Sequence, residues 1–200
     1  MNKTNSVYGI ALYGLFLIVT VTSVWFTVNS QPILTLDKTE LVASQDDAGE
    51  AGEHFLVEYT IDGQRYVRTL YMPIVKQVEE IADEYGINRG HMVAMCILEA
   101  SIPDPDGNYY ACNPEANGDA GKSFGIFQLN LGVHKSIPVD DAKNVVYASK
   151  WTANRLLRHD YKEYPKYAIK RHNGWGPMAD RYVDKVWQIA KTIKIIDNNL

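Results

Sequence analysis

The sequence predicts a mainly α-helical domain that carries a small β-hairpin and follows an apolar N-terminal segment. Three observations lead to this fold class. Residues 7–28 contain no charged side chain, residues 55–71 hold two apolar runs around an Asp-Gly pair, and apolar residues recur at helical spacing from residue 73 onward. We expect a tail and transmembrane anchor over 1–28, an acidic linker over 29–53, the hairpin over 54–71 and the helical domain over 72–200.

The first segment is long enough to cross a bilayer. At 1.5 Å per residue, the 22 residues of 7–28 span about 33 Å as a helix, which matches a hydrocarbon core of about 30 Å. A cleaved signal peptide is the alternative, but its apolar core would be shorter. Lys3 precedes the segment and acidic residues follow it, so we expect the N-terminus inside and the rest of the chain in the periplasm or outside the cell.

The overall charge excludes one class of partner. The formal net charge is -4 and the pI is about 5.7, so the chain is not built to coat nucleic acid. Residues 29–53 are acidic and show no useful period, which is typical of a linker. The pair Asp62-Gly63 between the runs 55–61 and 64–71 then predicts a two-residue hairpin turn.

The helical domain begins at Pro73, a residue suited to a first helical turn. Gly86 ends this helix and Asn88 can cap the next one. Residues 102–122 are rich in Pro, Gly, Asn and Asp and predict a long loop. Further helices are expected over 124–131, 140–160, 163–171 and 177–196.

Glu99 stands out because six apolar residues, 93–98, lead directly into it. This run has no polar stripe, so the helix is expected to be covered on most sides. Burial disfavours a carboxylate and raises its pKa, and a carboxylic acid that stays protonated near neutral pH can donate a proton to a leaving oxygen. Cys96 and Cys112, the two cysteines of the chain, either pair in an oxidising compartment or remain separate buried thiols.

Several motifs in order resemble the lytic transglycosylase (SLT-type) catalytic domain of the lysozyme-like superfamily. Residues 97–99 resemble the segment that bears the catalytic acid, residues 123–130 resemble the Gly-x-x-Gln motif, and residues 172–176 resemble the Tyr-Asn-x-Gly turn. The opening helix and its turn, over 81–88, also resemble the family. The resemblance covers residues 74–190 and implies an α+β lysozyme-like domain.

The resemblance implies an enzyme that cleaves the glycan strands of peptidoglycan without a cofactor or metal. Glu99 would protonate the oxygen between N-acetylmuramic acid and N-acetylglucosamine, then remove a proton from the 6-hydroxyl, leaving a 1,6-anhydro end. The implied substrate-binding residues are Ser123, Gly125, Gln128, His172, Asn173 and Tyr182. Such an enzyme would act on the wall for an assembly that crosses it, or for a phage.

The sequence departs from the family at two places. Ala100 stands where the family has a serine after the acid, with Ser101 one place further, and His172 replaces a tyrosine with a side chain that ordinarily titrates near pH 6.5. Two alternatives stay open. One is a lysozyme-type hydrolase, in which Asp104, Asp106 or Asp119 activates water. The other is a catalytically dead tether that binds peptidoglycan.

Other signals are weaker. Residues 116–123 nearly match a phosphate-binding loop, but no apolar strand precedes them. Residues 104–115 match part of a calcium-loop template, with Tyr109 where a glycine is required. The five histidines show no paired ligand spacing, so we expect no zinc site.

Overall fold

The computed structural model describes residues 54–103 and 107–197. The expected transmembrane anchor, the acidic linker, Asp104 and Asp106 lie outside these ranges. Within them, no helix is both long and apolar enough to cross a membrane. The described part is 49% helical and 21% strand, so it is a mixed α/β fold with more strand than the mainly helical class expected from the sequence.

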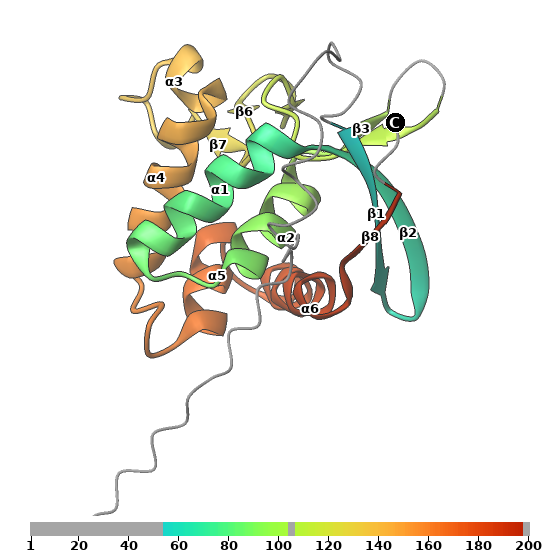
Figure 1. Ribbon diagram of the computed structural model, residues 1–200. Coiled ribbons are helices and arrows are strands. Elements are labelled where there is room, and N and C mark those ends of the chain that lie inside the picture. The colour runs from blue at the N-terminus through green and yellow to red at the C-terminus, as the bar shows by residue number, and fades with distance from the viewer. Residues whose placement is uncertain (1–53, 104–106, 198–200) are drawn as a thin grey trace, which may run out of the picture.

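The predicted hairpin is confirmed and lies at the centre of a sheet. Strands β1 (His54–Ile61) and β2 (Gln64–Tyr71) pair antiparallel, and Asp62 and Gly63 both have positive φ, as a tight hairpin turn requires. Strands β3 (Ile102–Pro103), β4 (Tyr109–Tyr110) and β8 (Lys194–Asp197) extend the hairpin into a sheet of order β3-β4-β2-β1-β8 (Figure 1). Alternate residues of β1 are buried, so one face of this sheet joins the core.

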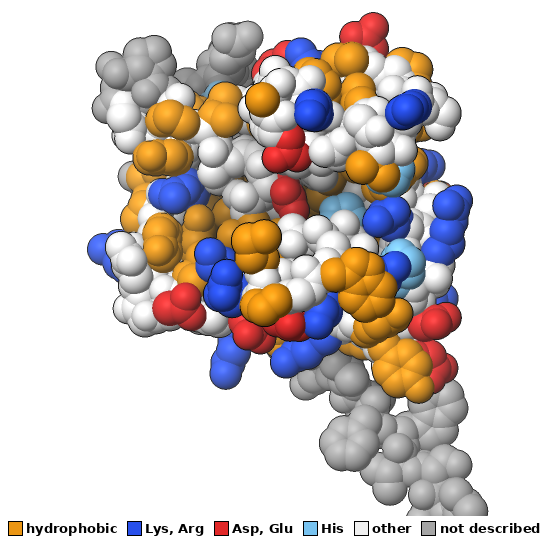
Figure 2. Space-filling model, turned by 180° about the vertical axis from the view of Figure 1, so that it is seen from behind, with side chains coloured by type: hydrophobic (Ala, Val, Ile, Leu, Met, Phe, Trp, Pro, Cys, Tyr) orange, Lys and Arg blue, Asp and Glu red, His pale blue; other side chains and the backbone are white. Residues whose placement is uncertain are grey.

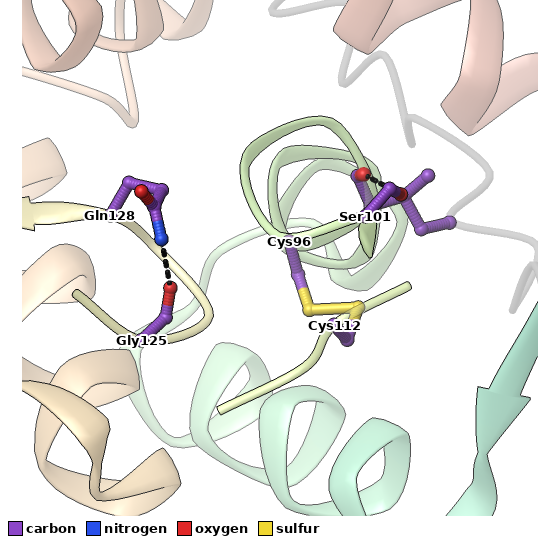
Figure 3. Close-up of a disulfide and its surroundings, with 6 residues drawn as sticks. Cys96, Ser101, Cys112, Gly125 and Gln128 are labelled. Carbon is purple, nitrogen blue, oxygen red and sulfur yellow. Dashed lines mark hydrogen bonds between the residues drawn. A yellow bond between two sulfur atoms is a disulfide. The ribbon is translucent and has the colours of Figure 1, made fainter. Parts of the chain in front are cut away.

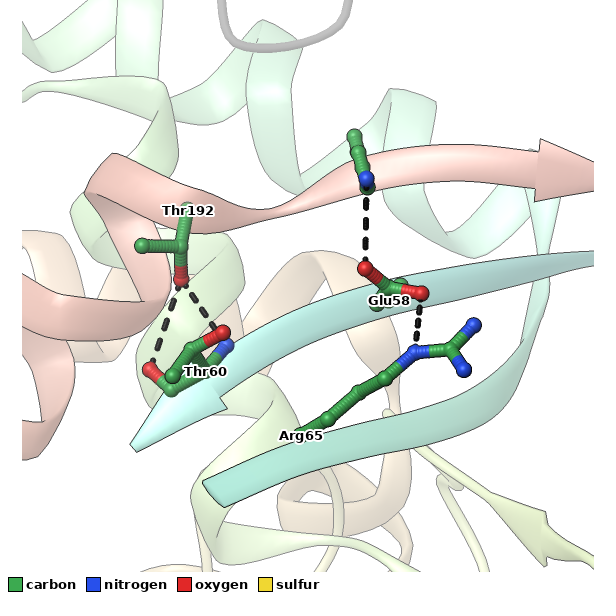
Figure 4. A network of polar contacts seen from close by, with 5 residues as sticks. Glu58, Thr60, Arg65 and Thr192 are labelled. Atoms are coloured by element: carbon green, nitrogen blue, oxygen red, sulfur yellow. Dashed lines mark hydrogen bonds and ion pairs between the residues drawn. The ribbon is translucent and has the colours of Figure 1, made fainter. Parts of the chain in front are cut away.

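Strand β8 was not predicted, because the apolar period of the last helix runs on through it. Helix α6 (Pro177–Thr192) ends four residues before the expected end, at 196. Beyond it, Lys194 pairs with Glu58 on β1, and the Thr192 hydroxyl accepts a hydrogen bond of 3.0 Å from the Thr60 backbone N–H (Figure 4). Pairing with β1 therefore replaces the last helical turn.

Helices α1 (Met72–Tyr85) and α2 (Arg89–Glu99) follow the sequence prediction closely. Gly86 ends α1 in the left-handed conformation with φ 66°, and the Asn88 side chain caps α2 by accepting from the backbone N–H of His91. Seven of the eleven residues of α2 are buried, which confirms that it is covered on most sides. It packs against α1 and α6 (Figure 1). Its last residue is Glu99.

The expected helix over 140–160 is two helices, α3 (Val139–Lys143) and α4 (Val145–Leu157). The break falls at Asn144, whose backbone is extended and whose side chain caps α4 by accepting from the backbone N–H of Tyr147. Helix α5 (Pro165–Asn173) lies within two residues of its predicted bounds at each end. It packs between α4 and α6.

The helix expected over 124–131 is wrong. A three-stranded antiparallel sheet takes its place, made of β5 (Asn117–Gly118), β6 (Ser123–Phe124) and β7 (Leu129–Asn130). Gly125 and Gln128 both have positive φ, which is incompatible with a right-handed helix. The near-match to a phosphate-binding loop over 116–123 is the β5–β6 hairpin of this sheet.

A disulfide joins Cys96 of α2 to Cys112 in the loop before β5, with 4.9 Å between the two Cα atoms (Figure 3). Of the two alternatives predicted for these cysteines, a disulfide or two separate thiols, the structure shows the disulfide. The bond lies one helical turn before Glu99, so it ties the end of α2 to the loop that leads into the three-stranded sheet.

Candidate active site

A groove of about 460 Å³ opens between the end of α2, the three-stranded sheet and the helices α4 and α5. Figure 2 shows this hollow, with acidic side chains inside it and histidine side chains beside it. Glu99 comes from α2 and Asp119 from the β5–β6 turn, while Arg155 comes from α4 and Asn173 from the end of α5. Residues far apart in the sequence thus converge on one concave surface, as expected for a ligand site.

Glu99 reaches this groove from the end of a helix of which seven of the eleven residues are buried. Burial raises its pKa to about 7, and the negative charge of Asp119 acts in the same direction. Interactions with the Tyr182 hydroxyl and the Asn173 amide act the other way, but burial outweighs them. A carboxyl with this pKa is partly protonated at neutral pH, so it can both donate and accept a proton there.

Asn173 and Tyr182 both lie beside Glu99, and they come from different helices. Asn173 lines the groove, so its amide can reach both Glu99 and a bound molecule. The Tyr182 hydroxyl is buried beside Glu99 and makes no hydrogen bond of normal geometry, and its pKa is raised well above its usual value by burial and by Glu99. Tyr182 is not among the residues that line the groove, and the neighbour that its hydroxyl faces is Glu99.

Asp119 is held in place by its own neighbours. One carboxylate oxygen accepts hydrogen bonds from the Ser123 hydroxyl at 2.5 Å and from the Asn130 amide at 3.2 Å. Ser123 is buried, and this bond occupies its hydroxyl proton. The predicted substrate-binding Ser123 therefore positions a second acidic side chain in the groove.

Gln128 lines the groove, but its amide is engaged by the protein. Its nitrogen donates to the backbone carbonyls of Gly125 at 2.9 Å and of Ala116 at 3.2 Å, which closes the β6–β7 turn (Figure 3). Gly125 does not line the groove. A Cβ at Gly125 would clash with the backbone carbonyl of Ala142, so this glycine allows the turn to pack on α3.

Ser101 does not replace the missing serine after the acid. Ser101 lies just past the end of α2, and its hydroxyl donates at 2.6 Å to the backbone carbonyl of Ile97 in the last turn (Figure 3). The buried Ala100 adds no polar group beside Glu99. The acid therefore has its polar neighbours on other elements, at Asn173, Tyr182 and Asp119.

One wall of the groove is basic and aromatic. Arg155 lies 5.5 Å from the ring centroid of Trp151, which His134 meets edge-on at 4.7 Å, and all three residues line the groove. His172 also lines it, but burial, with the nearby Arg155, lowers its pKa to about 3. His172 is thus neutral at physiological pH, and the titration near pH 6.5 considered from the sequence does not occur.

The sequence reasoning missed much of this wall. Trp151 and Arg155 are four residues apart on α4, so they share one helix face, but no motif marks that face. His134 follows β7 in a loop and carries no signal of its own. Asp119 was identified only as an alternative second carboxylate, and the groove brings it together with Glu99.

Within the described ranges, no cluster of three or more His, Cys, Asp or Glu side chains could hold a metal ion. Glu115, the last position of the calcium-loop template, pairs with Lys143 instead. No family model, curated protein or solved structure matches this chain. Its function therefore has to be inferred from the chemistry of the groove.

Proposed function

We propose that the chain is a peptidoglycan lytic transglycosylase with Glu99 as its single acid and base. The observation that carries this proposal is the carboxyl at the end of a buried helix, with a pKa near 7, facing a groove that also presents the Asn173 amide. Amide and hydroxyl groups suit the hydroxyl and acetamido groups of aminosugars. The resemblance of residues 74–190 to the SLT-type domain supports the same reading.

The reaction needs no group beyond the substrate and Glu99. Protonated Glu99 donates to the oxygen between N-acetylmuramic acid and N-acetylglucosamine, and the bond from that oxygen to C1 of the muramic residue breaks. The substrate's own acetamido oxygen supports the positive charge at C1. Glu99, now ionised, takes the proton of the 6-hydroxyl, whose oxygen bonds to C1. General acid–base help of this kind contributes about 10²–10⁴-fold.

Hydrolysis of the same bond is the second candidate, and Asp119 is the observation that favours it. Asp119 shares the groove with Glu99, and its oxygen is fixed by Ser123 and Asn130. A second carboxylate so placed can activate water or stabilise the sugar cation. The two reactions differ in product, since only the intramolecular route leaves 1,6-anhydromuramic ends.

Mass spectrometry of the soluble products separates these functions. Purified peptidoglycan is incubated with the full-length chain and, as control, with its Glu99→Gln variant. We expect anhydro ends from the wild-type protein alone. Reducing ends would establish the hydrolase, and no products from either protein would leave the peptidoglycan-binding tether.

We also propose that the groove faces the periplasm or the cell exterior. The Cys96–Cys112 disulfide supports this side, because such bonds persist in oxidising compartments. Segment 7–28, outside the described residues, would hold the chain in the membrane with its N-terminus inside. Protease added to intact spheroplasts should remove the domain, whereas protection of the domain would place it in the cytoplasm.

A further inference from the structure

Trp175 occupies a distinctive place at the rim of the groove. Asn173 and Gly174 line the groove, and Trp175 follows them directly in the short connection between α5 and α6. The glycines on either side have φ of 136° and 81°, and nothing lies within 4 Å of where their Cβ atoms would be. Both glycines therefore serve the backbone conformation on either side of the tryptophan, which other residues rarely adopt.

The indole ring is exposed and yet held in position. Trp175 is 68% exposed, and the Arg171 guanidinium lies 3.6 Å from the ring centroid. The cation covers one face of the ring, which leaves the other face open to solvent. Arg171 is itself tied to the groove wall, because its backbone carbonyl accepts a 3.3 Å hydrogen bond from Arg155.

Exposure alone carries no conclusion, since single apolar side chains are common on protein surfaces. The position of Trp175 and the size of the groove decide what the ring can bind. A groove of about 460 Å³ suits a small ligand, so a glycan polymer bound at Glu99 must continue over the rim. A single indole offers far less than the roughly 800 Å² per partner that a stable protein interface buries.

We infer that Trp175 is a stacking platform for a sugar ring of the bound strand, outside the groove. The apolar C–H face of a pyranose ring fits the open face of the indole, and Arg171 fixes the ring for it. The platform gives affinity for long strands and leaves the cleavage step to Glu99. This inference rests on the proposed action on glycan strands.

Binding to chitin oligosaccharides tests the platform without turnover. The full-length Glu99→Gln protein is compared with the Glu99→Gln/Trp175→Ala double variant by isothermal titration calorimetry, using chitohexaose and chitobiose. We expect about tenfold weaker binding of the hexamer and unchanged binding of the dimer, because an exposed aromatic contact is lost. Trp175→Phe should retain most of the hexamer affinity, since it keeps an aromatic face.

Tyr164→Ala in the same background is the matched control. Tyr164 is also exposed, but it caps the opposite end of α5, about 14 Å away along a nine-residue helix. Equal hexamer affinity with and without Trp175 would overturn the platform while leaving anhydro products as evidence for the enzyme. Equal loss for hexamer and dimer would overturn it too, and so would the absence of hexamer binding in the Glu99→Gln protein, whereas the proposed enzyme is judged separately by its anhydro products.

Discussion

Two glutamates of this chain share a raised pKa and differ in almost everything else. Burial raises the pKa of Glu99 to about 7, and burial also raises the pKa of Glu79 on α1 to about 7. Glu99 faces a groove with an amide and a second acid, whereas Glu79 is absent from the groove lining and has Arg89 and Asp83 for neighbours. A perturbed carboxyl therefore marks a candidate site only when it also faces space for a ligand.

The largest expected difference between the two is in activity. Glu99→Gln removes the proposed proton donor and should lower the rate of peptidoglycan cleavage by about 10²–10⁴-fold. Glu79→Gln should leave the rate unchanged, because Glu79 does not line the groove. Release of soluble muropeptides measures both. Similar losses in the two variants would remove the distinction between the sites.

The next effect concerns how the two ends of α2 are held. Replacing Cys96 and Cys112 by alanine opens a loop with a sequence separation of 16, and should lower the free energy of unfolding by about 3 kcal/mol. At the other end, Asp83→Asn breaks the exposed ion pair with Arg89 and should cost at most about 1 kcal/mol. Urea denaturation ranks the two, and equal losses would show that the disulfide adds little.

A smaller effect is expected on the pH dependence of activity, where the acidic neighbours of the two glutamates should act differently. Glu99 donates only when protonated, so activity should fall as the pH rises through about 7. Asp119→Asn removes a negative charge that raises the pKa of Glu99, so this limb of the pH–rate profile should move to lower pH. Asp83→Asn acts in the same sense on Glu79 and should leave the profile in place. Complete loss of activity in Asp119→Asn would favour the hydrolase.

The smallest expected effect is on thermal stability. Glu79 has a folded pKa of about 7 against about 4.5 when unfolded, so its favourable contribution is complete below pH 4.5 and is lost as the pH rises through 7. Glu79→Gln cannot ionise and should raise the Tm at pH 8 by about 2–4 °C, with no change at pH 4. Differential scanning calorimetry at the two pH values checks this. A gain of the same size at pH 4 would exclude ionisation as the cause.

Local sequence signals were sufficient to predict the hairpin and the helices α1 and α2. The Asp62-Gly63 turn, Gly86 and Asn88 each act within a few residues, and each was predicted where the structure has it. The burial of Glu99 was also predicted from its own segment, since an apolar run leads into it. Its proposed role remains a prediction.

The β6–β7 turn, strand β8 and the basic wall of the groove depend instead on contacts between distant segments. The turn between β6 and β7 has a helix-like apolar spacing, but Gln128 adopts a left-handed conformation and bonds back to Gly125. Strand β8 forms only because β1 offers an edge to pair with. The basic wall exists only when α4 packs against α5, so Arg155 could not be identified from its neighbours in the sequence.

The turn at Gly125 sets limits for anyone who would redesign this protein. Any side chain at that position would strike the Ala142 carbonyl, so a saturation library there should return glycine alone. Val133, by contrast, lines the groove and is 72% exposed. Efforts to alter what the groove binds should begin at Val133 and leave the glycine untouched.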